Sequence, residues 1–367
     1  MHKEFHKTRR ANRDLAEQLN AVAQVIRKHE VHLAALLPVY GWQDNSGTVP
    51  PGSIELFDLK MLEARLKDAS RRSEKVLEGE LKKAKILGSL RTLAKPPSLR
   101  VLQDLARDFP HFTEVIDLIR QRVSLARVTP GQVFLLPPIL LSGSPGVGKT
   151  AFVEALAKCL GQGFCRLDLA AATAGFALAG SHESWSSARH GAVWTLLQSP
   201  CASGVLMLEE IDKAAGSGSY PVLGSLYSLL EPVSAKHFKD EYIDLEVNAS
   251  SVIVVATCND PDLLEPALRS RFRCFTIPVP GPKDMPAIAR SVYRQLRESR
   301  PWGVVFPPEL PHAVLDRLKA ATPRQLSRAL EEAHARAAED GRLKLQPDDI
   351  VIEDESRAAT KPKLGFV

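Results

Sequence analysis

The apolar positions of this chain change their period along its length, and the change divides it into regions. Over residues 59–87, leucine, valine and alanine recur every three or four positions, which is the spacing of one buried helix face. A similar spacing runs over residues 15–37, and residues 38–53, rich in Pro, Gly, Ser and Asn, separate the two segments. The front of the chain, residues 1–105, is therefore predicted to be a mainly helical N-terminal domain.

After residue 105 short apolar runs alternate with amphipathic segments. Five segments are predicted to be strands separated by helices: 139–141, 164–169, 204–208, 251–257 and 274–279. Such alternation is typical of an α/β fold with a mostly parallel sheet covered by helices on both faces. We expect this core over residues 106–302, a small helical lid over 303–353 and a flexible C-terminal tail over 354–367.

Composition excludes several classes of protein. The 367 residues include 44% apolar and 25% charged residues, which are ordinary values for a globular chain. Pro137 and Pro138 interrupt the longest apolar run, and the first residues lack the apolar core of a signal peptide. The five cysteines include no C-x-x-C pair, so they predict reduced core thiols rather than a metal site. We expect a cytoplasmic protein that does not enter a membrane.

Positive charge is concentrated in the front of the chain. Residues 1–100 carry 19 Lys and Arg against 12 Asp and Glu, whereas the whole chain has a net charge of +5. Much of it falls on one face of the second periodic segment: Lys67, Arg71, Arg72, Lys75, Lys82, Lys83 and Lys85. A solvated face of a helical bundle accounts for this pattern. A patch that binds nucleic acid or an acidic partner accounts for it too, although aromatic residues that could stack on bases are scarce there.

The strongest chemical signal lies between the first predicted core strand and the helix that follows it. There the chain fits the Walker A pattern G-x-x-x-x-G-K-[ST], in which glycines let backbone N–H groups turn toward a phosphate at the helix end. Lys149 can reach the β- and γ-phosphates of ATP, and the Thr150 hydroxyl can ligate Mg²⁺. The residues expected to bind ATP are Gly143, Ser144, Pro145, Gly146, Val147, Gly148, Lys149, Thr150 and Ala151.

A second signal is the apolar strand that ends in Glu209 and Glu210. A hydrolase with a phosphate-binding loop needs one acid at such a strand end for the magnesium shell and a second to polarise the attacking water. We assign Glu210 as the base and Glu209 to the metal. Glu209 stands where an aspartate is usual, and its extra methylene moves the carboxylate outward by about one C–C bond, so that contact with the metal can run through water. Two exposed glutamates that begin a helix are the alternative.

Residues 209–213 resemble the D-E-I-D-K segment of AAA+ ATPases, and their surroundings resemble the ATPase module of Lon-type proteases. The match continues in order through residues 229–232, 238–245 and 252–259, and it covers roughly residues 109–350. The resemblance implies ATP and Mg²⁺ as cofactors and a homo-oligomeric ring, most often a hexamer, that acts on a protein client.

The resemblance also assigns roles to polar residues downstream. Asn259 ends the sensor strand, where it would hold the attacking water or the γ-phosphate. Arg271 matches the arginine finger, which reaches the γ-phosphate held by a neighbouring subunit, and Arg269 is a second candidate for that role. Arg324 matches the lid arginine called sensor 2. A surface salt bridge or a solvated helix position is the alternative for these arginines.

Residues 180–191 fall where the resemblance places the first pore loop. Trp185 is the aromatic residue that could grip an extended polypeptide, and a Trp packed under its own loop is the alternative. Ser186 and Ser187 make this loop more polar than the family pattern. Residues 236–246 are expected to form the hairpin that precedes the sensor strand.

The lid pattern ends near Ile350, and no Ser-Lys peptidase domain of the Lon type follows it in this sequence. We therefore expect an ATP-driven remodeller or unfoldase without its own protease. Residues 361–367 are similar in kind to the peptide by which Clp unfoldases dock on a separate peptidase ring, with a fraying terminus as the alternative. A second hypothesis is a nucleotide-gated binding switch, acting on nucleic acid, with slow ATP turnover.

Overall fold

The computed structural model describes residues 49–171, 174–182, 188–214 and 222–352. The chain divides into two compact units, Met1–Pro51 and Gly52–Val367. Of the first unit only residues 49–51 are described, and the architecture is that of the second. Across the described residues, no helix is both long enough and apolar enough to cross a membrane.

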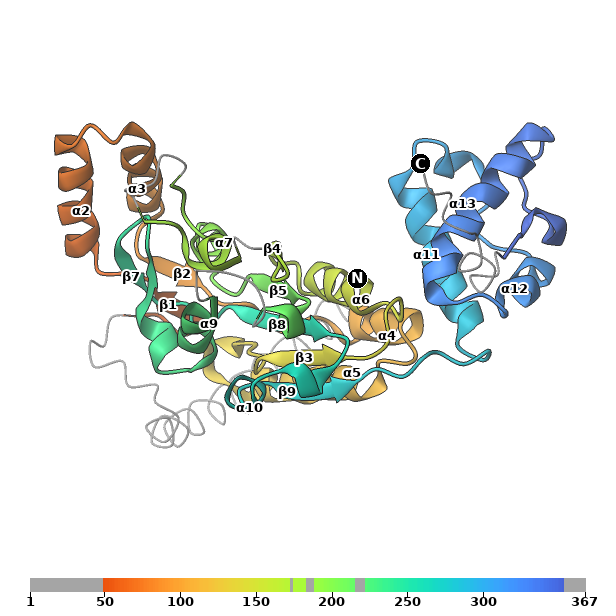
Figure 1. Ribbon diagram of the computed structural model, residues 1–367, viewed down its shortest axis with the longest axis horizontal. Helices are drawn as coiled ribbons and strands as arrows, with labels where there is room; N and C mark the ends of the chain where they lie inside the picture. The colour runs from red at the N-terminus through yellow and green to blue at the C-terminus, as the bar shows by residue number, and fades with distance from the viewer. Residues whose placement is uncertain (1–48, 172–173, 183–187, 215–221, 353–367) are drawn as a thin grey trace, which may run out of the picture. The chain divides into compact units, whose positions relative to one another are not determined.

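A five-stranded parallel sheet forms the centre of the second unit (Figure 1). Its strands are β3 (Ile139–Ser142), β4 (Phe164–Asp168), β5 (Val205–Glu209), β8 (Ile253–Cys258) and β9 (Arg273–Thr276). They pair in the order β4-β5-β8-β3-β9. Every residue of β3, β5 and β8 is buried, as expected for parallel strands covered on both faces. The predicted α/β class is confirmed, and all five predicted strands form.

Twelve described helices accompany the sheet. They are α2 (Leu59–Arg71), α3 (Lys75–Leu87), α4 (Leu99–Asp108), α5 (Thr113–Val128), α6 (Lys149–Leu160), α7 (Ala174–Ala179), α8 (Ala192–Leu197), α9 (Val222–Leu230), α10 (Pro266–Arg269), α11 (Met285–Ser299), α12 (His312–Leu318) and α13 (Pro323–Glu339). Two antiparallel strand pairs complete the fold: β1 (Ser53–Glu55) with β2 (Leu90–Thr92), and β6 (Phe238–Asp240) with β7 (Leu245–Val247). The second pair is the predicted hairpin. The first was not predicted, because strands of three residues are too short to show an alternating pattern.

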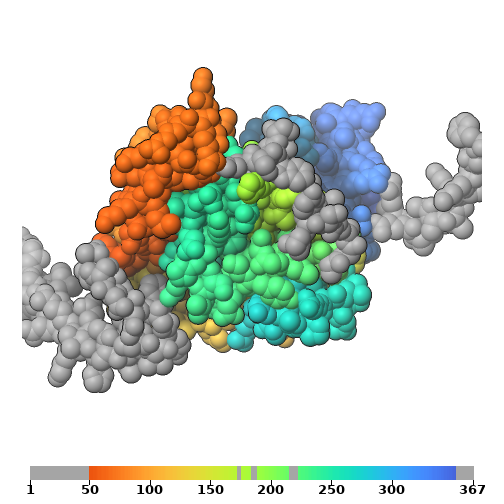
Figure 2. Space-filling view, turned by 60° about the vertical axis from the view of Figure 1, so that its left-hand side comes forward, coloured from red at the N-terminus to blue at the C-terminus, as the bar shows by residue number. Residues whose placement is uncertain are grey.

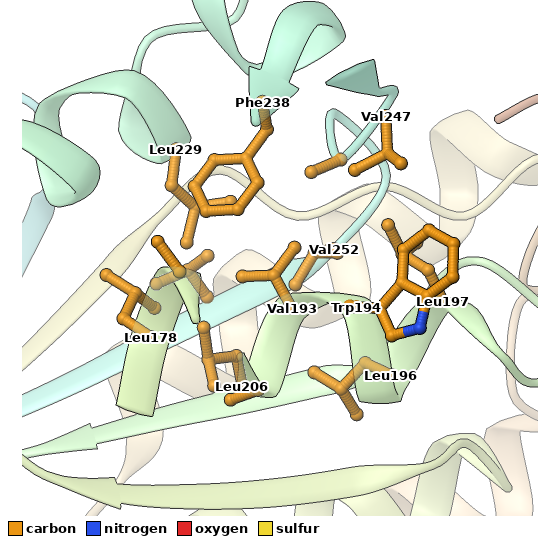
Figure 3. Close-up of a cluster of buried hydrophobic side chains, with 14 of the residues drawn as sticks. Leu178, Val193, Trp194, Leu196, Leu197, Leu206, Leu229, Phe238, Val247 and Val252 are labelled. Carbon is orange, nitrogen blue, oxygen red and sulfur yellow. The ribbon is translucent and has the colours of Figure 1, made fainter. Parts of the chain in front are cut away.

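Side chains of the sheet alternate between two hydrophobic clusters, one on each face. Leu206 and Val254 join the cluster formed with α7, α8 and α9, and Figure 3 shows Leu206 among their side chains. Met207 and Val255 join the opposite cluster, formed with α5 and α6. The second of these clusters packs α6, the helix that follows the loop with the Walker A pattern, against the sheet.

The periodic segment over residues 59–87 forms the pair of helices α2 and α3. Their residues Leu62 and Leu81 share the cluster that contains Leu206, and Arg65 donates a hydrogen bond from Nε to the carbonyl oxygen of Ile243 at 3.1 Å. Figure 2 shows this front segment, in orange, packed against the green residues that include the β6–β7 hairpin.

Acidic neighbours pair with four of the cations on the basic face of this helix pair. The pairs are Arg72 with Asp68, Lys82 with Glu78, Lys83 with Glu80 and Lys85 with Glu63. These exposed ion pairs contribute little to stability, but they lower the net positive charge that the face presents to a partner.

Helices α11, α12 and α13 pack around a third hydrophobic cluster, in the region predicted to be the lid. Helix α11 begins at Met285, before the lid boundary at residue 303 that the sequence predicts. Within this cluster His334 is buried and stacks on Tyr293, with ring centres 5.3 Å apart. The predicted domain boundaries near residues 105, 302 and 353 stay predictions.

Leu140 provides a test of the sheet's packing, because it is fully buried in β3. Leu140→Ala removes apolar contacts and leaves a cavity, so we expect the free energy of unfolding to fall by about 2–5 kcal/mol. Leu125→Ala, at a position 55% exposed on α5, is the matched control and should change it by no more than about 0.5 kcal/mol. Urea denaturation followed by circular dichroism measures both, and equal losses would contradict this placement of β3.

Candidate functional site

The residues that fit the Walker A pattern form a loop between β3 and α6. The chain turns through Gly143, Gly146 and Gly148, all with positive φ, before α6 begins. Gly148 has φ 95° and ψ 18°, a left-handed conformation that is strained for residues with a Cβ atom. At Gly146 a Cβ atom would lie 2.9 Å from Cβ of Arg324. The backbone path and the lid contact therefore both require glycine here.

Lys149, the first residue of α6, turns its side chain back over this loop. Its Nζ donates hydrogen bonds to the carbonyl oxygens of Gly143 at 2.6 Å and Ser144 at 3.2 Å, and to Oδ1 of Asn259 at 3.2 Å. Burial lowers the pKa of Lys149, and nearby negative charge, including that of Asp212, opposes this shift. The contact with Asn259 brings together two predicted site residues that are 110 positions apart.

Thr150 and Glu209 also meet, as the sequence predicts for a metal site. The Thr150 hydroxyl donates to Oε1 of Glu209 at 2.7 Å. The other carboxylate oxygen, Oε2, accepts a hydrogen bond from Nε of Arg166, a residue of β4. The Glu209 side chain is only 11% exposed, so both of its oxygens are held by neighbours in a confined place.

Glu210 stands at the turn after β5 with φ 52° and ψ 45°, a conformation uncommon for a residue with a side chain. Its Oε2 lies 2.6 Å from Nζ of Lys213. Asp212 accepts the backbone N–H groups of Asn259 at 3.0 Å and Asp260 at 3.3 Å, which ties this turn to the end of β8. The strained turn presents the Glu210 side chain at the edge of the sheet.

These residues line a cavity of about 570 Å³. Its described lining includes all the predicted ATP-binding residues from Pro145 to Ala151, together with Glu209, Glu210 and Asn259. Gly143 and Ser144 contribute through the carbonyl groups that hold Lys149. A volume of this size accommodates a small-molecule ligand.

Residues of the predicted lid complete the cavity. Arg324, at the start of α13, lines it together with residues of α11. Arg294 of α11 forms two hydrogen bonds to Asp108 at the end of α4, with N–O distances of 2.9 and 3.2 Å. Asp108 itself lines the cavity, so this bidentate pair links the lid directly to its wall.

The two candidates for the arginine finger lie elsewhere. Neither Arg269 nor Arg271 is among the described residues that line the cavity. Arg269 pairs with Asp262 at 2.6 Å, whereas the Arg271 guanidinium lies 4.6 Å from the ring centre of Tyr227. Tyr227 donates its hydroxyl to Glu265 at 2.7 Å, and this hydrogen bond raises its pKa. Trp185 and residues 361–367 lie outside the described residues.

The oxygen atoms at the cavity are suitable ligands for Mg²⁺. The Thr150 hydroxyl and the Glu209 carboxylate are hard oxygen ligands 2.7 Å apart, beside the loop expected to hold phosphates. No cluster of three or more His, Cys, Asp or Glu residues is placed to hold a metal in the described part of the chain. An ion shared between one or two protein oxygens, water and the phosphates of a nucleotide needs no such cluster.

The part of the chain that carries this site matches a known family. The family described as "ATPase family associated with various cellular activities (AAA)" matches residues 139–279, from the start of β3 to just beyond β9. The chain contains an AAA domain. ATP hydrolysis is the general activity of that family.

Curated relatives of this AAA domain are Lon proteases. The chain is 31% identical over 136 residues to Lon protease homolog 2, peroxisomal, of Caenorhabditis elegans, a match that covers 36% of this chain and 18% of that protein. It is 30% identical over 179 residues to the Lon protease of Aquifex aeolicus, covering 48% and 22% respectively. Over 233 residues it is 26% identical to the Lon protease of Salinispora arenicola, covering 62% and 30%. The matches thus span less than a third of these relatives, and the predicted resemblance to their ATPase module is confirmed.

A solved structure shares the fold of the AAA domain. The closed state of Hsp104 with ATPγS and FITC casein matches with a TM-score of 0.53 at 15% identity, over 68% of this chain and 52% of that chain. At this identity the likeness is one of fold alone.

The sequence did not point to every residue of the site. Arg166 precedes Asp168 by two positions in β4, and polar residues alternating beside the acid-bearing strand are a signal that could have found it. His111 is buried against the loop, where its Nε2 lies 2.8 Å from the carbonyl oxygen of Val147. Nothing in the sequence distinguishes His111, or the ion pair of Arg294 with Asp108, from ordinary core and surface residues.

We expect buried His111 to make the stability of the folded chain depend on pH. Burial lowers its pKa below the ordinary value of 6.5, partly opposed by the bond to Val147, so the folded chain binds this proton less readily than the unfolded chain. Stability should therefore fall as the pH drops below about 6.5. His111→Gln, which keeps a donor for Val147, should reduce the loss between pH 7.5 and 5.5 by up to about 1 kcal/mol. Urea denaturation at both pH values measures it, and parallel profiles would contradict the expectation.

Proposed function

We propose that this chain binds ATP with Mg²⁺ at the cavity beside the Walker A loop, hydrolyses it, and uses the cycle to remodel or unfold a protein client. The observation that carries the proposal is the convergence on one cavity of Lys149 after β3, Glu209 at the end of β5 and Asn259 just after β8. Phosphoryl transfer to water requires a cation that binds the phosphate, a carboxylate beside the metal position and a polar residue that faces them.

Each polar group at the cavity then serves a step. Lys149 exchanges two loop carbonyls for phosphate oxygens, which form stronger, charge-assisted hydrogen bonds with an ammonium group. Thr150 and Glu209 would hold Mg²⁺, which when bound neutralises charge on the phosphate oxygens. Glu210 takes a proton from the attacking water as general base, and Asn259 positions that water. For this step Glu210 exchanges its contact with Lys213 for the water.

We further propose that the active form is a homo-oligomeric ring, with six subunits by resemblance to its relatives. Arg271 would then reach the nucleotide of a neighbouring subunit, with Arg269 as the second candidate. The absence of both from the described lining of their own cavity supports action across a subunit boundary. Arg324 lines its own cavity, which supports a role in coupling the lid to the nucleotide within one subunit.

The client in this proposal is a polypeptide gripped by Trp185. Its support is the position of Trp185 in the sequence and the Lon proteases among the relatives, which are proteins named for acting on polypeptides. A separate peptidase docked on residues 361–367, and a cytoplasmic location, belong to the same proposal.

A second candidate function is a nucleotide-gated switch with slow turnover. The observation that favours it is the Arg166 guanidinium on Glu209, because a cation at that carboxylate lessens its capacity to serve a metal ion. In this version the basic face of α2 and α3 binds nucleic acid. The four ion pairs on that face weaken this part of the alternative.

Steady-state ATP hydrolysis over a range of protein concentrations tests the ring motor. Turnover per subunit should rise cooperatively with concentration, because Arg271 completes the site of a neighbour. Lys149→Ala should abolish ATP binding and turnover, and Arg271→Ala should lower turnover about 10³-fold or more with binding retained. Arg120→Ala, on the surface of α5, is the control. Tight binding with negligible turnover in the unaltered chain would favour the switch, and full turnover in Arg271→Ala would exclude Arg271 as the finger.

Glu210→Gln tests the assignment of the general base. The amide has the shape of the carboxylate but cannot take the proton of water, so turnover should fall about 10²- to 10⁴-fold with little change in ATP affinity. Phosphate release and the binding of a fluorescent ATP analogue measure the two quantities. Glu114→Gln, an exposed glutamate on α5, is the matched control. Retained turnover would place the base elsewhere.

A further inference from the structure

Arg166 occupies an unusual place at the cavity. It comes from β4, the strand that pairs with β5, and its partner in the register is Met207, two residues before Glu209. Side chains two apart on a strand share a face, so Arg166, Asp168 and Glu209 all point to the same side of the sheet. The guanidinium donates to Oε2 of Glu209, although Asp168 lies closer along its own strand.

Glu209 has no oxygen left without a hydrogen-bond partner. Oε1 accepts the Thr150 hydroxyl at 2.7 Å, and Oε2 accepts Nε of Arg166. A carboxylate that approaches Mg²⁺, directly or through water, must turn at least one oxygen toward the metal. The Thr150 hydroxyl would itself turn to the metal, whereas a guanidinium can only donate, and its fixed positive charge repels a divalent cation.

The two side chains differ in burial, and this difference decides which can move. The Glu209 side chain is 11% exposed, whereas that of Arg166 is 54% exposed. The Arg166 side chain can therefore turn into solvent without leaving a cavity, whereas the buried Glu209 side chain cannot. A competing cation can break this contact because its more exposed partner, Arg166, regains its hydration when the guanidinium turns to solvent.

We propose that Arg166 competes with the divalent cation for Glu209 and so raises the Mg²⁺ concentration that the nucleotide site requires. Arg166 is then a positioning residue: it acts through Glu209 and not on the nucleotide. This inference rests on the proposed ATP site, and it offers one physical origin for the slow turnover of a switch.

Binding of a fluorescent ADP analogue, N-methylanthraniloyl-ADP, to the full chain during a Mg²⁺ titration tests the proposal. Arg166→Gln should lower the Mg²⁺ concentration at half-maximal binding roughly three- to tenfold, the change expected from the loss of an ion pair whose cation is more than half exposed. Affinity in EDTA should stay within twofold. Arg120→Gln is the matched control, because it removes an exposed Arg–Asp pair on α5 away from the cavity and should leave the midpoint unchanged.

A second variant separates action through Glu209 from direct contact with the nucleotide. In a Glu209→Gln background, Arg166→Gln should cause no further shift of the Mg²⁺ midpoint, because the competing pair is already gone. An unchanged or higher midpoint in Arg166→Gln, or weaker binding in EDTA, would overturn the role of Arg166 and leave the ATP site standing. Failure of the unaltered chain to bind the analogue at any Mg²⁺ concentration would overturn both.

Discussion

The common direction of β3, β5 and β8 is the constraint on which the site depends. Parallel strands end at the same edge of a sheet, so residues that follow them become neighbours whatever their separation along the chain. The register sets Ser142 beside Cys258, and this places the loop after β3 against Asn259. A slip of one residue in this pairing would turn each strand's buried side chains to the opposite face and break both hydrophobic clusters. Packing over the whole sheet therefore fixes the spacing of a few polar groups at its edge.

The buried carboxylate of Asp240 ties the expected pore loop, residues 180–191, to the β6–β7 hairpin. Asp240, at the end of β6, is fully buried and accepts the backbone N–H of Gly191 at 2.8 Å, besides two N–H groups of its own hairpin. A Cβ atom at Gly180 would lie 2.7 Å from its Oδ1, so Asp240 contacts both ends of the proposed pore loop. Leaving those N–H groups unpaired would be costly at such a depth. The hairpin thus anchors the base of this loop to the AAA domain.

The sequence predicted best those features that a pattern of neighbouring residues is enough to define. The five strands of the sheet, four to six residues long, and the glycine spacing around Lys149 are set by near neighbours, and all of them appear as expected. The strands β1 and β2 were missed because pairing over three residues leaves no periodic trace. Arg166 and His111 were missed for a different reason, since each acts through a partner more than thirty positions away, and only the register or the packing brings them together. The roles assigned to Glu210 and Arg271 stay predictions.

The hydrogen bonds that Lys149 makes in this structure affect how quickly the site can bind a ligand with a phosphate and how well it distinguishes that ligand from one without. Its ammonium is held by Gly143, Ser144 and Asn259, so the side chain already points across the loop and loses little conformational freedom when a phosphate arrives. These are bonds from a charged donor to neutral oxygens, weaker than those to an anionic phosphate. A ligand without a phosphate in this position cannot replace the hydrogen bonds of Lys149 to neutral oxygens with stronger ones. In the proposed function, an ammonium group that turns to a phosphate would also release Oδ1 of Asn259, and the Asn259 amide would then be available to position water once the nucleotide is bound.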